Sequence, residues 1–118
     1  MPSLNMEGPY PLNEKTVDAR VVLEEAAGNY ALGFVEQGRF FVQYIGRSDT
    51  DLNRRIKEHI GEPYSYFMFS CAANAAQAYQ KECVNYHDFT DAGNRLDNEI
   101  HPSRPEGYPS LRCPRCNT

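Results

Sequence analysis

The chain has 118 residues and a formal net charge of −4 at pH 7, and 12% of its residues are aromatic. This length suits one domain, and the aromatic content excludes a wholly disordered chain. The sequence has no run of about 18 apolar residues, so it predicts no membrane span. The opening residues, MPSLNMEGPYPLNEK, lack the pattern of a secretory signal. We therefore expect a cytoplasmic protein whose four cysteines are reduced and serve as core residues or metal ligands.

The acidic net charge argues against nucleic-acid binding through the overall field of the protein. The charge is uneven, however. Residues 1–29 carry two basic and five acidic side chains, a net charge of −3, whereas residues 39–59 carry five basic and three acidic ones, a net charge of +2. The second segment predicts a local basic face on an acidic body.

The first third of the chain predicts a lead-in, a helix and a β-hairpin. Residues 1–15 are rich in proline, asparagine and glycine and predict an irregular segment. A helix is expected from Thr16, which can cap its start, to Gly28, which can end it. Residues 29–35 and 39–46 both alternate in polarity around a glycine-containing turn, which predicts two antiparallel strands.

The middle of the chain predicts two helices that flank a third strand. Leu52, Ile56 and Ile60 recur at helical spacing before Gly61. The aromatic residues 64–72 predict a strand, and residues 74–89 predict a second amphipathic helix. The expected fold is therefore α+β, with a three-stranded antiparallel sheet flanked by helices.

Polar side chains of this core are spaced so that they can converge. Arg55 and His59 lie four residues apart and share one helix face, close to the strand that ends near Tyr44. A guanidinium suits phosphate binding because it is planar, always charged and a multiple donor. Glu82 on the second helix is a candidate carboxylate ligand for a hard cation.

Four motifs in this order resemble those of the GIY-YIG nuclease superfamily: GNY at 28–30, YIG at 44–46, LNRRIKEH at 52–59 and KEC at 81–83. The resemblance covers residues 28–89. It implies a β-β-α-β-α nuclease core, preceded by an extension and helix in residues 1–27 and followed by an irregular tail in residues 90–118. Asn29 departs from the pattern because the middle residue of the first motif is usually apolar, and this affects strand packing more than chemistry.

The resemblance implies a metal-dependent endonuclease that hydrolyses phosphodiester bonds, with DNA as the expected nucleic acid. Tyr30 would position or deprotonate the attacking water, and Tyr44 would bond the phosphate or the nucleophile. Arg55 would stabilise phosphate charge, His59 would be a base or a phosphate contact, and Glu82 would hold Mg²⁺ or Mn²⁺. The general base stays open between Tyr30 and His59.

Gly46, Arg47 and Ser48, at and just after the second motif, are the expected substrate contacts. The little chain outside the core predicts low intrinsic specificity or a partner protein that delivers the substrate. An inactive binding or adaptor module with the same fold is the alternative reading.

The tail carries a second motif, CPRC, whose Cys113 and Cys116 make half of a zinc site. Cys83 and His87 on the second predicted helix are four residues apart and complete a Cys₃His set. His101 competes with His87 as the fourth ligand, whereas Cys71 is expected in the core. Because no hydrophobic periodicity follows Phe89, zinc is expected to anchor an otherwise unattached tail.

Overall fold

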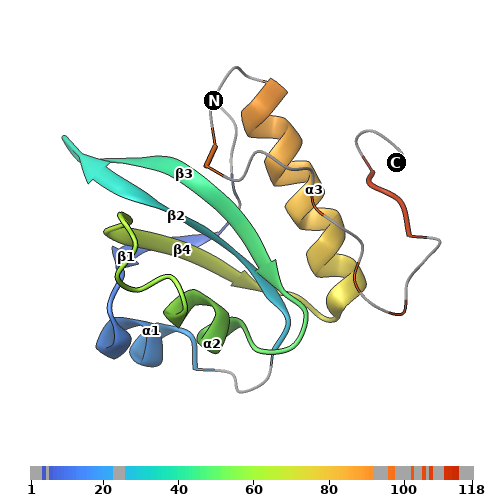
Figure 1. The fold of residues 1–118 in the computed structure, drawn as a ribbon, viewed down its shortest axis with the longest axis horizontal. Helices are drawn as coiled ribbons and strands as arrows, with labels where there is room; N and C mark the ends of the chain where they lie inside the picture. Colours follow the sequence, from blue (N-terminus) through green and yellow to red (C-terminus); the bar gives the residue numbers. More distant parts are fainter. Residues whose placement is uncertain are drawn as a thin grey trace.

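The computed structural model describes residues 4, 6–22, 26–91, 96–97, 102, 105, 107 and 111–114. Within these residues the elements follow the order β1, α1, β2, β3, α2, β4, α3 (Figure 1). The α+β class and the antiparallel sheet are confirmed, but the prediction of three strands is wrong. The described sheet has four strands in the order β1-β4-β2-β3, and every neighbouring pair is antiparallel.

The hairpin consists of β2, Gly28–Glu36, and β3, Arg39–Ser48, and it agrees with the alternation of the sequence. The third predicted strand is β4, Tyr66–Cys71, which pairs with β2. The additional strand is β1, Glu7–Pro11, at the open edge beside β4. Its glycine and prolines conceal it in the sequence, yet an edge strand tolerates proline because one row of its backbone groups has no ladder partner.

The first helix is shorter than predicted. Helix α1 spans Glu14–Arg20, and its N-cap is Asn13, whose side chain accepts a hydrogen bond of 2.8 Å from the Thr16 backbone. The expected start at Thr16 and end at Gly28 are therefore wrong, since Gly28 already belongs to β2. Asparagine caps a helix well because its oxygen satisfies one of the unpaired N–H groups of the first turn.

Both predicted core helices are present, but the predicted end of the first one at Gly61 is wrong, because α2 ends at Lys57 and the exposed Ile60 lies beyond it. Helix α2 spans Leu52–Lys57 and is capped by Asp51. Helix α3 spans Ala75–Asp91, and the Asn74 side chain accepts from the Gln77 backbone at 2.9 Å. The part of the chain that the structure describes holds no helix long and apolar enough to cross a membrane.

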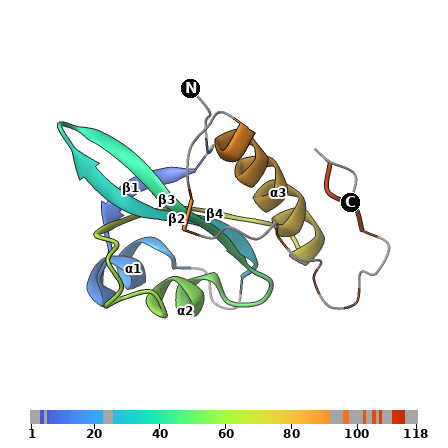
Figure 2. The same cartoon turned by 45° about the horizontal axis from the view of Figure 1, so that its top comes forward.

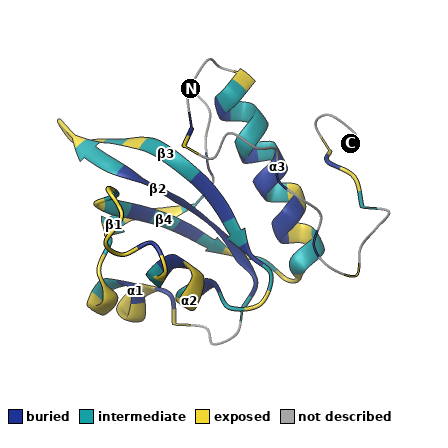
Figure 3. Cartoon of the chain, in the orientation of Figure 1, coloured by how far each residue is buried: buried dark blue, intermediate teal, exposed yellow. Residues whose placement is uncertain are grey.

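Helices α1 and α2 cover one face of the sheet and α3 covers the other. In Figure 2 the first two lie below the sheet and α3 lies above it. Because side chains alternate along a strand, the two faces have separate cores. The α2 face contains Tyr30, Leu32, Leu52, Ile56 and Phe67, among others, and the α3 face is built around Ala31, Ile45 and Phe89. Figure 3 shows this burial running along β2 between the helices.

Residues 96–97, in the first part of the predicted tail, contact the sheet. Leu96 is buried in the core of the α3 face. The Asp97 backbone donates a hydrogen bond of 2.6 Å to the Gln43 carbonyl on β3, and its carboxylate accepts one of 2.7 Å from the Tyr64 hydroxyl. At residues 96–97 the expectation of an otherwise unattached tail is therefore wrong. Two residues are too short a segment to show hydrophobic periodicity in the sequence.

Candidate functional site

A chain of three side chains lies on the α2 face. The Tyr30 hydroxyl and Nε2 of His59 are 2.8 Å apart, and Nδ1 of His59 is 2.8 Å from Oε1 of Glu62. An ionised carboxylate only accepts, so Nδ1 carries the proton and donates to Glu62. In the neutral imidazole Nε2 then accepts the hydrogen bond that the Tyr30 hydroxyl donates. Both hydrogen bonds therefore run in one direction, with Tyr30 donating to His59 and His59 donating to Glu62.

The Tyr30 hydroxyl is the centre of this cluster. Burial, above all, raises the pKa of Tyr30 well beyond its usual range, and the Tyr44 hydroxyl adds to this. The Arg55 guanidinium acts against the rise, through its charge and a hydrogen bond to the same hydroxyl. Tyr30 therefore stays protonated at neutral pH and serves as a donor, which excludes a resident tyrosinate base.

Tyr44 and Arg55 form the more exposed part of the cluster. The Tyr44 ring stacks on Tyr30 with centroids 6.1 Å apart and lies 4.9 Å from the His59 ring. The Arg55 side chain is 45% exposed and is bonded to Glu58 at 2.7 Å, whereas Tyr30 has no exposed surface. A ligand from solvent would therefore meet Arg55 and Tyr44 before Tyr30.

Gly46 makes the position of Tyr30 possible. The two residues are opposite each other in the β2–β3 ladder. A Cβ atom at residue 46 would lie 2.5 Å from both Cζ and the hydroxyl oxygen of Tyr30. The structure therefore gives Gly46 a packing role beneath the tyrosine ring, beside the substrate contact expected from the sequence.

Alanine at residue 46 is expected to destabilise the protein by about 1–3 kcal/mol, because overpacking forces a buried ring from its rotamer. Urea unfolding should show a lower midpoint with an unchanged m-value. The matched control is the same change in a Tyr30→Val background, which lacks the ring atoms that the methyl group would meet. Equal costs in both backgrounds would contradict this packing role.

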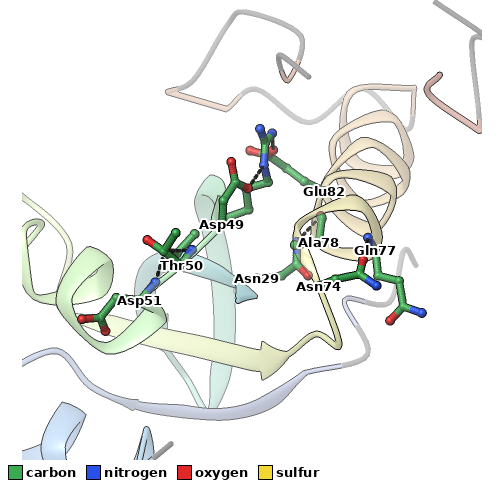
Figure 4. A network of polar contacts seen from close by, with 10 residues as sticks. Asn29, Asp49, Thr50, Asp51, Asn74, Gln77, Ala78 and Glu82 are labelled. Carbon is green, nitrogen blue, oxygen red and sulfur yellow. Dashed lines mark hydrogen bonds and ion pairs between the residues drawn. The ribbon is translucent and has the colours of Figure 1, made fainter. Parts of the chain in front are cut away.

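Glu82 lies on the other face of the sheet, in a network with Arg47 (Figure 4). Nη1 of Arg47 donates to Oε1 of Glu82 at 2.7 Å, and Nε donates to Asp49 at 2.7 Å. The Arg47 guanidinium also lies over the Tyr79 ring, 5.2 Å from its centroid. The two acidic partners favour the charged guanidinium and, against its partial burial, raise the pKa of Arg47.

Two neighbours of the site have structural bonds that the sequence did not predict. The Ser48 hydroxyl accepts from the Asp51 backbone at 2.9 Å, which sets up the start of α2. Asn29 is buried, and its side chain donates a hydrogen bond of 2.8 Å to the Ala78 carbonyl, which connects β2 to α3. The polar residue at position 29 therefore acts in strand–helix packing.

The predicted catalytic residues thus fall into two groups. Tyr30, Tyr44, Arg55 and His59 meet on the α2 face, whereas Glu82 reaches the sheet from α3. The groups are electrostatically connected, because the Glu82 carboxylate contributes to the raised pKa of Tyr30.

Of the expected zinc ligands, Cys83 and Cys113 are brought together. Both are fully buried, and their side chains are within hydrogen-bonding contact. His87 lies one turn further along α3, while Cys116 and the alternative ligand His101 lie outside the described residues. Among the residues that are described, no three His, Cys, Asp or Glu side chains form a group that could hold a metal ion.

Sequence reasoning missed Glu62 and Asp49. Glu62 follows His59 by three residues across Gly61, which has a positive φ of 100°, so helical spacing does not place it. Asp49 follows Arg47 by two residues at the end of a strand, which is a weak signal for a contact. Comparison of the chain with protein-family models, curated proteins and solved structures found no match.

Proposed function

We propose that the protein is a metal-dependent endonuclease of the GIY-YIG type that hydrolyses phosphodiester bonds, with DNA as the first substrate to test. One observation carries the proposal. The Tyr30 hydroxyl donates to His59 and is bonded by Arg55, so a proton acceptor and a phosphate-binding cation meet at one atom. Packing alone does not require this combination in a strand tyrosine.

In the proposed reaction, a water oxygen attacks phosphorus and the bond to the leaving oxygen breaks. The proton of the water passes to the Tyr30 oxygen while the Tyr30 proton passes to Nε2 of His59. Glu62 stabilises the resulting imidazolium through Nδ1, and the leaving oxygen takes a proton from solvent. In this proposal Tyr30 and His59 share the role of general base.

Arg55 and Tyr44 would contact the substrate phosphate. Because Arg55 is half exposed, a phosphate can draw its guanidinium away from the Tyr30 hydroxyl. The hydroxyl would then be open to water. The same guanidinium then stabilises the negative charge that develops on phosphorus oxygens. Substrate binding would in this way uncover a relay that is closed in the free protein.

The residues present fit a single divalent ion, because Mg²⁺ keeps several waters and needs only one or two carboxylates. Glu82 would hold Mg²⁺ or Mn²⁺ with one carboxylate oxygen while Oε1 is bonded to Arg47. When bound, the ion would supply Lewis-acid polarisation of the phosphate. Arg47 would keep the carboxylate ionised and oriented.

One observation favours the alternative, a binding or adaptor module without catalysis. Tyr30 has no exposed surface, and Glu82 is engaged by Arg47 in an ion pair whose side chains are only 10–12% exposed. Plasmid DNA incubated with Mg²⁺ or Mn²⁺ separates the two functions, with DNA binding measured in parallel. Metal-dependent cleavage supports the nuclease, and binding without cleavage by any metal rejects it in favour of the module.

Glu62→Gln is expected to lower kcat about tenfold, a small part of the 10²–10⁴-fold that general acid–base catalysis contributes. Glutamine can still accept from Nδ1, so the ring stays in place and only the negative charge is lost. The acidic limb of the pH–rate profile should therefore move to lower pH. Glu36→Gln at the hairpin turn is the control, and identical profiles for both variants would remove Glu62 from the relay.

A further inference from the structure

The end of the β2–β3 hairpin carries two phenylalanines whose rings stack. The Phe34 and Phe41 rings have centroids 5.1 Å apart and planes inclined by 17°. The two residues are opposite each other in the ladder, so cross-strand pairing accounts for the stack. It does not bury Phe41, which is 40% exposed. The hairpin end extends beyond the helices in Figure 1, and its turn is coloured as exposed in Figure 3.

A guanidinium lies over the exposed ring. Cζ of Arg39 is 5.9 Å from the centroid of the Phe41 ring, within the range of a cation–π contact. Arg39 is itself exposed, and it forms no ion pair with any residue that the structure describes. Its ladder partner on β2 is the exposed Glu36. The hairpin end thus presents an aromatic ring and a planar cation together to solvent.

The stacked rings share a sheet face with the proposed catalytic site. Side chains alternate along β2, so Phe34 lies on the same face as Tyr30, two ladder rows away, and the row between them contains Tyr44. At about 3.3 Å per strand residue, Phe34 and Tyr30 are about 13 Å apart along β2. A few nucleotides of one strand span this distance, since stacked nucleotides in DNA advance by about 3.4 Å each.

We propose that Phe41 and Arg39, supported by Phe34, form a platform that stacks an unpaired base of the substrate beside the cleavage site. The inference rests on the proposed function for its substrate, DNA. An aromatic ring stacks on any base because every base has a π face, and arginine adds a cation–π contact. A base inside a duplex is already stacked on its neighbours, so the platform favours single-stranded DNA.

The charge at the hairpin end favours a polyanion over an apolar protein surface. The Arg39 guanidinium would lose its hydration against an apolar partner without gaining a hydrogen bond in return. A nucleotide offers this cation both a phosphate and a π face. The platform and Arg55 would then hold the same strand at two points.

Phe41→Trp tests the stacking directly. The chain has no tryptophan, so the substitution introduces a single indole fluorophore at the platform. A short single-stranded DNA oligonucleotide, titrated in EDTA so that no metal-dependent cleavage occurs, should quench this fluorescence because a base stacks on the indole. A blunt duplex of the same sequence should quench it far less.

Phe41→Leu should weaken binding of the single strand, measured by fluorescence anisotropy in EDTA, about 5–150-fold. This range corresponds to the about 1–3 kcal/mol that stacking contributes per base. Leucine keeps an apolar contact with Phe34 but has no π face, and thermal melts check that the variant folds. Val22→Ala is the control, because it truncates another exposed apolar side chain, after α1, and should bind like the wild type.

The platform and the nuclease can fail separately, because binding is measured without metal. Quenching in Phe41→Trp, together with weaker binding by Phe41→Leu, would support the platform even in a protein that cleaves no plasmid. Absent binding, equal binding by Phe41→Leu and the wild type, or equal quenching by duplex and single strand would overturn it, whatever the plasmid assay shows. A wild-type dimer that Phe41→Leu dissociates in sedimentation would also overturn it, because the ring would then join two copies of the chain.

Discussion

Arg55→Ala is expected to lower kcat for phosphodiester cleavage about 10²–10³-fold, the usual effect of removing one preorganised donor to a developing anion. Two losses combine in this variant. The phosphate loses a guanidinium, and Tyr30 loses the cation that opposes the rise of its pKa. The effect should appear in kcat more than in KM, because the charge on phosphate grows toward the transition state.

Arg54→Ala is the matched control for this prediction. Arg54 is the neighbouring residue on the same helix and also pairs with Glu58, but its side chain is 76% exposed. Arg54→Ala removes a surface ion pair, worth about 0–1 kcal/mol. Arg55→Ala removes in addition its hydrogen bond to the Tyr30 hydroxyl, worth about 0.5–1.5 kcal/mol, so neither change should unfold the protein. Thermal melts should confirm this. A kcat for Arg55→Ala within threefold of the Arg54→Ala value would contradict the assigned role.

The sequence predicted those parts of the fold that local periodicity determines. The hairpin and α2 follow from alternation and from the spacing of Leu52 and Ile56, since each pattern buries one face of one element. Strand β1 could not be predicted in this way. Gly8, Pro9 and Pro11 give the segment turn-like chemistry, and only its pairing with β4 makes it a strand.

The candidate site shows the same division between local and tertiary information. The spacing of Arg55 and His59 predicts one shared helix face. His59 lies just beyond the end of α2, yet the structure brings both side chains to the Tyr30 hydroxyl. The bond from His59 to Glu62 depends on the backbone turn at Gly61, and the Arg47–Glu82 pair joins residues that are 35 positions apart. The first contact needs a turn that helical spacing does not predict, and the second is created by the packing of α3 against β3.

Burial also distinguishes residues that look alike in the sequence. Tyr30 and Tyr44 are the tyrosines of two motifs, but Tyr30 lies on the central strand β2, in the core that α2 covers, while Tyr44 lies on the edge strand β3. Tyr30 therefore has the strongly raised pKa and the inner position in the relay. In the proposed reaction the more exposed Tyr44 and Arg55 would therefore be the residues that contact the substrate.

Glu82→Gln is expected to reduce metal-dependent cleavage at least about 100-fold, since metal polarisation of a phosphate contributes several kcal/mol to transition-state stabilisation. Glutamine keeps an oxygen that can accept from Arg47, so the variant removes the charge while it preserves the shape. Alanine is the wrong probe. It would leave the Arg47 guanidinium poorly paired, and breaking a buried pair from one side costs about 3–5 kcal/mol.

Asp49→Asn is the control that separates a structural role of Glu82 from metal binding. It removes the other carboxylate that pairs with Arg47, also at 2.7 Å, and leaves Glu82 intact. Mg²⁺ should raise the melting temperature of the wild type and of Asp49→Asn, because an ion that binds only the folded state stabilises it. The shift should vanish in Glu82→Gln. If both variants kept the shift and the cleavage rate, Glu82 would be a partner of Arg47 in packing alone, because an ion held by its carboxylate could not survive the loss of the charge.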